Sequence, residues 1–262
     1  MKYGFIGCGN MGSALARSLS RATKDIMLSD SLKEKAQLLG EELGCRYADN
    51  TTVASECERI FLGVKPQMMA GMLDSIRVGL TIKKPLLITM AAGLEISTIE
   101  KAVGGELPII RIMPNTTASV GKGMILYCKN ELVDDATLAD FLNDMRFCGI
   151  LDAIDESLID AACSVSGCGP AFMYMFIEAL ADGAVACGLP REKAIKYAAA
   201  TMSGAAELAL TSGKHPELLK DEVCSPAGST IMGVKALEDG GLRAAAINAV
   251  IAAFKRNKEL GK

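Results

Sequence analysis

A glycine-rich turn near the N-terminus has the spacing of a phosphate-binding site. Gly7, Gly9 and Gly12 form a G-x-G-x-x-G pattern directly after a strand-like run and before a helix predicted from Asn10 to about Arg21. Glycines permit a tight turn and a close approach of the backbone to a pyrophosphate, and the helix N-terminus offers free N–H groups. In this context the pattern predicts a dinucleotide site rather than a ligand-free turn.

A carboxylate lies about twenty residues beyond the glycines, where dinucleotide-binding folds recognise the adenosine ribose. Asp30 ends the second expected strand, and an acid there suits NAD because it accepts hydrogen bonds from the ribose hydroxyls. Ser29 and Ser31 are instead able to donate to the 2′-phosphate of NADP, with charge from Lys33 or Lys35. Asp30 or Ser31 is also a candidate N-cap of the next helix. The choice of dinucleotide stays open.

Two later turns are expected beside the glycines at the carboxyl edge of the sheet. The turn "GVKP", residues 63–66, ends one expected strand and starts a helix with Pro66 in its first turn. The turn "AAG", residues 91–93, follows the apolar run "LLITM". Small residues and a proline at such strand ends leave room for a flat cofactor. Both turns therefore extend the expected dinucleotide site.

A polar turn in the C-terminal half, "CSPAGST" at residues 224–230, resembles an anion site. Proline sets the turn, alanine and glycine lack bulk, and the residues up to Thr230 present the free N–H groups that open a helix. A small carboxylate fits there. The alternative is ordinary helix capping by the Ser225 or Ser229 hydroxyl, which leaves no ligand. The helix that follows is expected to bury one apolar face formed by Ile231, Val234 and Leu237.

Histidine and cysteine usage excludes several kinds of chemistry. His215 is the only histidine, so a multi-histidine metal site is impossible, and we predict no metal. The nine cysteines are scattered without a C-x-x-C pair, which predicts reduced thiols in a cytoplasmic protein. We see no secretory leader, and no run reaching the ~18 apolar residues of a membrane span.

The charge balance limits the kinds of partner. The formal net charge is -3, so no basic field is available to attract nucleic acid or an acidic membrane surface. Half of the residues are apolar, which is enough for a substantial core. Small molecules and other protein chains are therefore the expected partners.

The order of expected elements predicts an α/β fold. In the first part of the chain, apolar runs alternate with helical patterns, as in a mostly parallel, Rossmann-like sheet with helices on both faces. The strand candidates are "KYGFIG", "DIMLSD", "RIFLGV", "PLLITM", "PIIRIM", "GMILYC" and "GILDAI". We expect this dinucleotide-binding domain to cover residues 1–156.

The rest of the chain, residues 157–262, predicts an all-α domain for substrate binding and dimerisation. Helical segments follow one another with breaks at residues 188–190, 212–214 and 225–226. The segment from Pro170 to Leu189 is apolar almost all the way round, and such a helix must be covered on every side. A domain of this size covers it poorly alone, so we predict a homodimer. The alternative is that it forms the central helix of a self-sufficient bundle.

The whole chain resembles the pyrroline-5-carboxylate reductase family. The motifs "GFIGCGNM", "GVKPQ", "MAAGL", "RIMPNT", "VSGCGPAF" and "CSPAGST" occur in the order and at the spacings of that family. The resemblance implies reduction of 1-pyrroline-5-carboxylate to L-proline with NADPH or NADH, the last step of proline biosynthesis. It also implies a helical domain that dimerises by interleaving with its twin, and rings of five dimers.

Site residues follow from these turns and from the resemblance together. The expected cofactor-binding residues are Ile6, Gly7, Cys8, Gly9, Asn10, Met11, Gly12, Ser29, Asp30, Ser31, Asn50, Gly63, Val64, Lys65, Pro66, Ala91, Ala92 and Gly93. The expected substrate-binding residues are Val223, Ser225, Gly228, Ser229, Thr230, Met113 and Asn115. Thr230 is the candidate catalytic residue, as the hydrogen-bond donor to the ring nitrogen.

Four positions depart from the family pattern. Ala227 stands where the family usually has glycine, Cys168 where it has serine, Phe172 where it has tyrosine, and Thr117 where it has proline. Ala227 is expected to need a negative φ that glycine does not need. Asp30 is not typical of family members that clearly prefer NADP. The departures thus concern loop geometry and cofactor choice more than the reaction.

Two rival functions are compatible with part of the sequence. A β-hydroxyacid dehydrogenase has a similar plan and resembles "GFIGCGNMG", but that family places a catalytic lysine on the first long helix of the second domain. The segment from Gly169 to Cys187 contains no lysine. A non-catalytic dinucleotide sensor that uses the helical half only to dimerise is the other alternative, and a turnover assay separates it from an enzyme.

Overall fold

The computed structural model describes residues 1–260 of the chain. These residues form two compact units. The first comprises Met1–Cys168 together with the end of the last helix from Ala253 onward, and the second comprises Gly169–Ala252. The first unit is α/β and the second is built of helices, so the predicted fold class is confirmed.

An eight-stranded sheet forms the centre of the first unit, in the order β3-β2-β1-β4-β5-β6-β7-β8. Strands β1 to β6 are parallel, β7 runs antiparallel to β6, and β8 is parallel to β7. The strands are β1 (Tyr3–Ile6), β2 (Ile26–Ser29), β3 (Arg46–Tyr47), β4 (Arg59–Leu62), β5 (Leu86–Thr89), β6 (Ile109–Met113), β7 (Gly123–Lys129) and β8 (Gly149–Ala153). The strand order reverses between β1 and β4, which is where such sheets bind ligands.

All seven predicted strands are present, and β3 was missed. β3 has only two residues, both exposed, so it carries no apolar pattern that sequence analysis could detect. The central strands are buried on both faces, as their unbroken apolar runs require.

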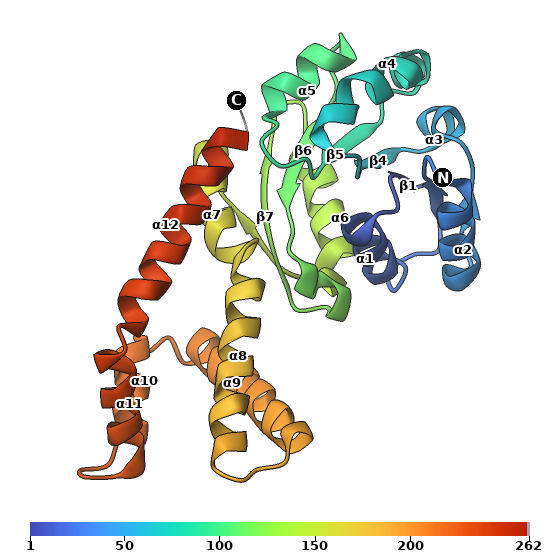
Figure 1. The fold of residues 1–262 in the computed structure, drawn as a ribbon. Helices are drawn as coiled ribbons and strands as arrows, with labels where there is room; N and C mark the ends of the chain where they lie inside the picture. Colours follow the sequence, from blue (N-terminus) through green and yellow to red (C-terminus); the bar gives the residue numbers. More distant parts are fainter. Residues whose placement is uncertain (261–262) are drawn as a thin grey trace. The chain divides into compact units, whose positions relative to one another are not determined.

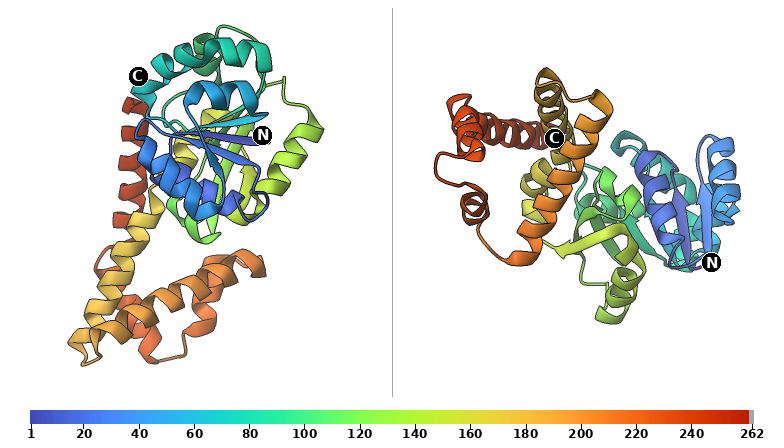
Figure 2. Two further views of the ribbon diagram at one scale, coloured as in Figure 1. Left: turned by 90° about the vertical axis from the view of Figure 1, so that its right-hand side faces the viewer. Right: turned by 90° about the horizontal axis from the view of Figure 1, so that it is seen from below.

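Helices cover both faces of the sheet (Figures 1 and 2). One face packs against α1 (Asn10–Leu19), α2 (Lys33–Leu43) and α6 (Asp135–Met145). The other packs against α3 (Asn50–Glu56), α4 (Pro66–Lys83) and α5 (Ile96–Val103). Short 3₁₀ turns are η1 (Thr116–Val120), η2 (Arg146–Cys148) and η3 (Glu156–Leu158), and α7 (Ile159–Ser166) completes this part of the chain.

Aromatic side chains anchor the first of these two cores. Phe5 of β1 and Phe61 of β4 stack with ring centroids 4.3 Å apart, and Phe141 of α6 lies 6.2 Å from Phe61. Adjacent residues of β1 alternate between the faces, so Phe5 enters this core and Ile6 enters the opposite one. The glycine turn after β1 therefore starts from a strand that is packed on both sides.

A charged network closes the amino-terminal edge of the sheet. The Tyr3 hydroxyl donates to the Asp144 carboxylate of α6 at 2.9 Å and accepts from the Arg59 guanidinium at 2.8 Å. Lys2 Nζ lies 2.7 Å from the same carboxylate of Asp144, and both cations also pair with Asp140. Burial raises the pKa of Tyr3 above its ordinary value, so Tyr3 remains a neutral donor. The network joins β1, β4 and α6.

The second unit consists of helices separated at the predicted breaks. They are α8 (Gly169–Ala186), α9 (Arg191–Ser212), α10 (Pro216–Val223), α11 (Ser229–Asp239) and α12 (Leu242–Leu260), whose last turns belong to the first unit. Of α8, only Ala181 is buried, while Tyr174 and Met175 are 59% and 70% exposed. No residue of α11 is buried either, so its expected apolar face is uncovered in a single chain.

The expectation that no segment is long and apolar enough to span a membrane is wrong. The continuous stretch Glu156–Ala186 is long and apolar enough to cross a membrane, and a window of 18 residues within it has a mean hydropathy of 1.2. This length arises because η3, α7 and α8 join into one segment. Its apolar surface is also what a helix buried between chains would show.

The compact units divide later than the expected domain boundary after residue 156. Ile159 of α7 packs with Met113 and Leu126 of the sheet, so α7 belongs to the first unit although its sequence is helical. The chain enters the second unit only at Gly169. The boundary after residue 156 stays a prediction about where the helical sequence pattern begins.

Candidate active site

A cavity of about 550 Å³ opens at the reversal of strand order, beside the glycine turn. Of the expected cofactor residues, those that line it are Ile6, Gly7, Gly9, Asp30, Ser31, Asn50, Gly63, Val64 and Lys65. They come from turns far apart in the sequence, which the parallel strands β1, β2 and β4 bring to one edge. The structure thus gathers half of the expected residues around one space.

The three glycines of this turn are required for different physical reasons. Gly7 has a φ of +108°, and a Cβ there would lie 2.6 Å from the Gly63 backbone. A Cβ at Gly12 would lie 2.1 Å from the Gly7 carbonyl oxygen, so helix and turn are in close contact. A Cβ at Gly9 would meet no atom within 4 Å and would enter the cavity. Packing therefore requires Gly7 and Gly12, whereas Gly9 leaves space for a ligand.

Helix α1 begins at this cavity with its first N–H groups uncapped. Gly9 is the N-cap and offers no side-chain acceptor. The unsatisfied N–H groups and the positive end of the helix dipole favour an anion at that point. Together with the space beside Gly9, they fit the pyrophosphate of a dinucleotide.

Asp30, in the turn after β2, is hydrogen-bonded to the glycine turn. One carboxylate oxygen accepts from the Cys8 backbone N–H at 2.7 Å, and the other accepts from the Leu32 N–H at 2.9 Å. Leu32 is the N-cap of α2, so the alternative in which Asp30 or Ser31 caps that helix is wrong. Burial raises the pKa of the Cys8 thiol to about 12, so Cys8 does not react as a thiolate.

A second cavity of about 550 Å³ adjoins the first across Asp30, Ser31 and Asn50. It lies between the turn after β2 and the start of α3, and Ser29 and Tyr47 also line it. The Ser29 hydroxyl donates to the Asn50 side-chain oxygen at 2.6 Å, which fixes both turns relative to each other. The position of this second cavity, beyond Asp30, suits the adenosine half of a dinucleotide.

The remaining expected cofactor residues do not line the first cavity. Cys8, Asn10, Met11, Gly12 and Pro66 are in the adjoining turns and helix starts, Ser29 is in the second cavity only, and Ala91, Ala92 and Gly93 form the loop after β5. Sequence reasoning missed the lining residues Leu32, Gln67, Met68, Gly71 and Met72. The signal for Gln67 and Met68 was available, because they follow Pro66 in the first turn of α4.

In the second unit, the turn "CSPAGST" leads into a helix without a side-chain cap. Gly228 is the N-cap of α11, and neither Ser225 nor Ser229 caps it, so the capping alternative is wrong. A Cβ at Gly228 would lie 2.3 Å from the Ser225 hydroxyl oxygen, so the turn is tightly closed. Thr230 is the second residue of α11, next to the uncapped N–H groups. The geometry suits a small carboxylate.

Ala227 in this turn corrects an expectation. Its φ is +55°, in the left-handed region, although alanine was expected to need a negative φ. The turn keeps the shape that glycine adopts easily, and the Cβ of alanine makes that conformation less favourable. The departure from the family pattern therefore raises the energy of the turn.

The expected substrate residues of the first unit are held by the fold. Met113, at the end of β6, is buried with Leu126 and Ile159. The Asn115 side chain donates to the Ser166 carbonyl at 2.8 Å and accepts from the Thr117 hydroxyl at 2.8 Å and the Met124 N–H at 3.1 Å. Proline at position 117 would lack this hydroxyl, so Thr117 supports Asn115. Val223, at the end of α10, is exposed in the second unit.

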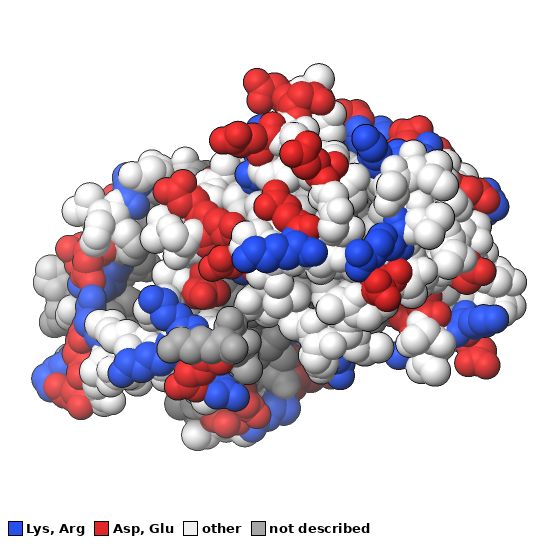
Figure 3. Space-filling model, turned by 90° about the horizontal axis from the view of Figure 1, so that it is seen from above, with Lys and Arg blue, Asp and Glu red and all other residues white. Residues whose placement is uncertain are grey.

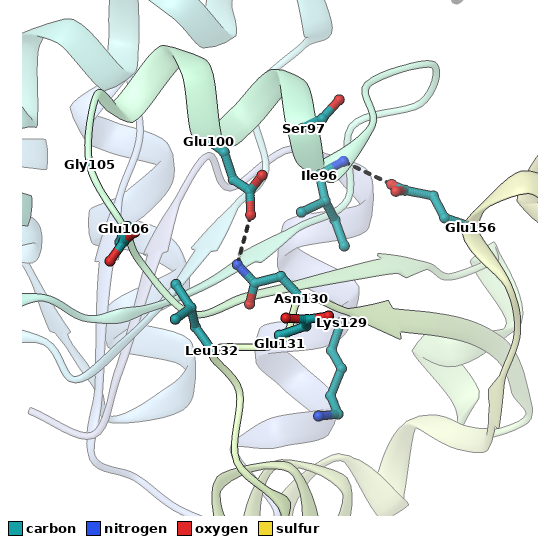
Figure 4. Close-up of a pocket in the computed structure, with 10 residues that line it drawn as sticks. All are labelled: Ile96, Ser97, Glu100, Gly105, Glu106, Lys129, Asn130, Glu131, Leu132 and Glu156. Atoms are coloured by element: carbon teal, nitrogen blue, oxygen red, sulfur yellow. Dashed lines mark hydrogen bonds between the residues drawn. The ribbon is translucent and has the colours of Figure 1, made fainter.

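A cavity of about 580 Å³ lies apart from the glycine turn, along α5 (Figure 4). Glu100 accepts there from the Asn130 side chain at 3.0 Å, and Glu156 accepts from the Ile96 N–H at 2.8 Å. Figure 3 shows a face of the molecule on which acidic side chains gather among basic ones. None of the expected site residues lines this cavity, so we do not place the reaction there.

A Rossmann-type sheet, a glycine turn at its switch point and a following helical unit together define a dinucleotide-dependent oxidoreductase. Two family models match the chain. Residues 2–93 match "NADP oxidoreductase coenzyme F420-dependent", and residues 156–260 match "Pyrroline-5-carboxylate reductase dimerisation". The second match includes α8. Because it is a dimerisation model, it shows that the chain is a homo-oligomer.

Relatives named pyrroline-5-carboxylate reductase match along the full chain. One from Methanosarcina acetivorans is 42% identical and one from Escherichia coli 40% identical, each covering 100% of this chain and 98% of the relative. A solved structure from Coxiella burnetii has a TM-score of 0.91 at 33% identity, over 100% of this chain and 98% of the other. The chain belongs to the pyrroline-5-carboxylate reductase family.

Proposed function

We propose that this protein reduces 1-pyrroline-5-carboxylate to L-proline with NADH or NADPH, the last step of proline biosynthesis. The observation that carries the proposal is the cavity at Gly9, where an uncapped helix start faces open space in a chain of this family. The Plasmodium falciparum relative, 35% identical with a TM-score of 0.88, is described with NADP bound. It covers 100% of this chain and 98% of its own.

In this proposal the protein supplies position and charge rather than proton transfer. The reduced nicotinamide, when bound, supplies a hydride to the carbon of the protonated cyclic imine. The N–H groups at the start of α11 hold the substrate carboxylate, and the Thr230 hydroxyl oxygen accepts a hydrogen bond from the protonated ring nitrogen. Val223, Ser225, Gly228, Ser229, Met113 and Asn115 complete the substrate site. A chain with one histidine is able to do this chemistry.

The proposed cofactor site comprises the glycine turn, Asp30 with its neighbours, and the turns 63–66 and 91–93. Gly9 and the start of α1 hold the pyrophosphate. Asp30 faces the ribose, and its two backbone hydrogen bonds keep the carboxylate in place. We propose that both dinucleotides are used and that NADH is used better than in relatives without this acid.

Replacing Asp30 by asparagine should raise the ratio of kcat/KM for NADPH to that for NADH by about tenfold, because an acid close to a 2′-phosphate costs on the order of one to a few kcal/mol. Asparagine keeps an oxygen able to accept from Cys8 or Leu32. Glu34→Gln, in the first turn of α2 and outside both cavities, is the control. An unchanged ratio in Asp30→Asn removes Asp30 from the cofactor site.

We propose that the homo-oligomer is built from dimers that cover α8, and that five dimers form a ring. The exposed apolar side chains of α8 support a partner chain at this helix. Sedimentation at micromolar concentration is expected to show dimers or a larger even assembly. A well-folded native monomer would contradict this. The nine free cysteines support our proposal that the protein acts in the cytoplasm.

The experiment that tests the function is oxidation of NADH and of NADPH on adding 1-pyrroline-5-carboxylate. Turnover is expected with both. Binding of dinucleotide without turnover would favour the sensor, and turnover with a β-hydroxyacid instead would favour the rival dehydrogenase. Because α8 contains no lysine, we expect no activity towards β-hydroxyacids.

A further inference from the structure

A buried arginine lies in the middle of the sheet, outside the site described above. Arg111 is on the central strand β6 and only 3% exposed, with neighbouring strands paired on both sides. Its Nη1 donates to the Glu156 carboxylate at 2.9 Å, whereas its Nε has no hydrogen-bond partner among the residues described. Burying an unpaired cation destabilises the fold. The ion pair with the Glu156 carboxylate offsets this free-energy cost for Arg111.

The same carboxylate oxygen makes a second contact. Glu156 Oε1 also accepts from the backbone N–H of Ile96 at 2.8 Å, the bond drawn in Figure 4. Ile96 is the first residue of α5, and Glu95, its N-cap, provides no side-chain hydrogen bond. Glu156, sixty positions away in the sequence, therefore caps the N-terminus of α5. Arg111 holds that acid in position.

The segment capped in this way is the loop after β5. Residues 90–95 connect β5 to α5 and include Ala91 to Gly93. Within the loop, the Leu94 N–H reaches the Ala91 carbonyl at 3.4 Å, and the Ala91 N–H reaches the Thr89 hydroxyl at 3.4 Å. Both contacts are long for hydrogen bonds. The 2.8 Å bond from Ile96 to Glu156 is the shortest that fixes the end of the loop.

We propose that Arg111 and Glu156 are positioning residues that hold the loop 91–93 against the nicotinamide end of the dinucleotide. The inference rests on the proposed function, which puts this loop at the cofactor. β5 is separated from β2 and Asp30 by β1 and β4, so the loop after β5 lies away from the adenosine ribose, at the nicotinamide end. Glu156 sets the position at which α5 begins, and this fixes the loop between that point and the buried end of β5. The adenosine end is bound through other turns, so Glu156 has no contact with it.

The test compares binding of NADH with binding of ADP-ribose, which lacks the nicotinamide. Glu156→Ala is expected to weaken NADH binding by about tenfold, while the Kd of ADP-ribose stays within about twofold. Glu156→Gln should remain within about threefold of wild type for both ligands, because its amide oxygen still accepts from the Ile96 N–H. Glu95→Ala removes an acid from the same helix start without removing a cap and should change neither Kd.

Equal loss of affinity for both ligands in Glu156→Ala, no loss for either, or the same loss in Glu95→Ala would overturn the proposal. If Glu156→Ala does not fold, Glu156→Asp carries the comparison. It keeps the charge near Arg111 but is one methylene too short for the Ile96 bond, and the same selective loss is expected. The binding measurements need no substrate. A wild-type protein that binds NADH but does not reduce 1-pyrroline-5-carboxylate therefore contradicts the proposed function separately.

Discussion

Replacing Asp144 by alanine should lower the free energy of unfolding by about 3–5 kcal/mol, the cost of breaking a buried charge network by removing one partner. The Asp144 side chain is 10% exposed. One of its carboxylate oxygens accepts from the Tyr3 hydroxyl and also pairs with the Lys2 ammonium. Its loss leaves buried Tyr3 without its acceptor, with Arg59 close by. Urea denaturation at a fixed protein concentration measures the change.

Asp140 provides the matched control, because it lies one turn earlier on α6 and pairs with the same Lys2 and Arg59. Its side chain is 45% exposed, so Asp140→Ala should cost less than about 1 kcal/mol. A hydrogen bond from Arg59 lowers the pKa of Asp140, so its small contribution is present above the ordinary carboxyl pKa and lost as the pH falls through the lowered value. Equal losses in the two variants would show that burial does not decide the energy of this network.

Replacing Thr230 by valine should lower kcat/KM for 1-pyrroline-5-carboxylate by roughly tenfold to a hundredfold, the effect of about 1.5–3 kcal/mol from one lost hydrogen bond. Valine keeps the volume and deletes the hydroxyl. Thr230 lies in the second unit, while the glycine turn is in the first, so the Kd of the dinucleotide should hardly change.

Thr230→Ser is the control for this substitution, since it keeps the hydroxyl and should retain most of the activity. A Thr230→Val protein with full kcat/KM would remove the hydroxyl from the mechanism. The turn "CSPAGST" would then be a carboxylate site made by backbone N–H groups alone. Loss of activity in both variants would instead indicate that the hydroxyl and the methyl group are both needed.

The strands and the glycine turn could be predicted from sequence because their causes are local. A buried parallel strand must be apolar on both faces, and a turn before a helix must contain glycine where the backbone closes on itself, as Gly7 and Gly12 do. The order of the strands then brought the turns 7–12 and 63–66 together. The two-residue β3 lacks such a local signal.

Contacts between distant residues could not be predicted in the same way. Nothing in the local sequence shows that Glu156 caps α5 or that Asp30 accepts from the Cys8 N–H rather than capping α2. A propensity also failed at Ala227, where closure of the turn overrides the preference of alanine for negative φ. The apolar pattern of α8 predicted that it must be covered, but a sequence pattern does not say by which chain.

The uncovered helix α8 has a consequence for how the protein behaves in the cell. In the proposed dimer, a newly synthesised chain leaves the ribosome with Tyr174 and Met175 in contact with water, and pairing with a second chain is the step that buries them. Folding and pairing then become one equilibrium, so the folded fraction depends on how much of the protein the cell makes. At low expression the unpaired chain is exposed to chaperones and proteases for longer. Gene dosage would thus influence the lifetime of each molecule as well as the number of molecules.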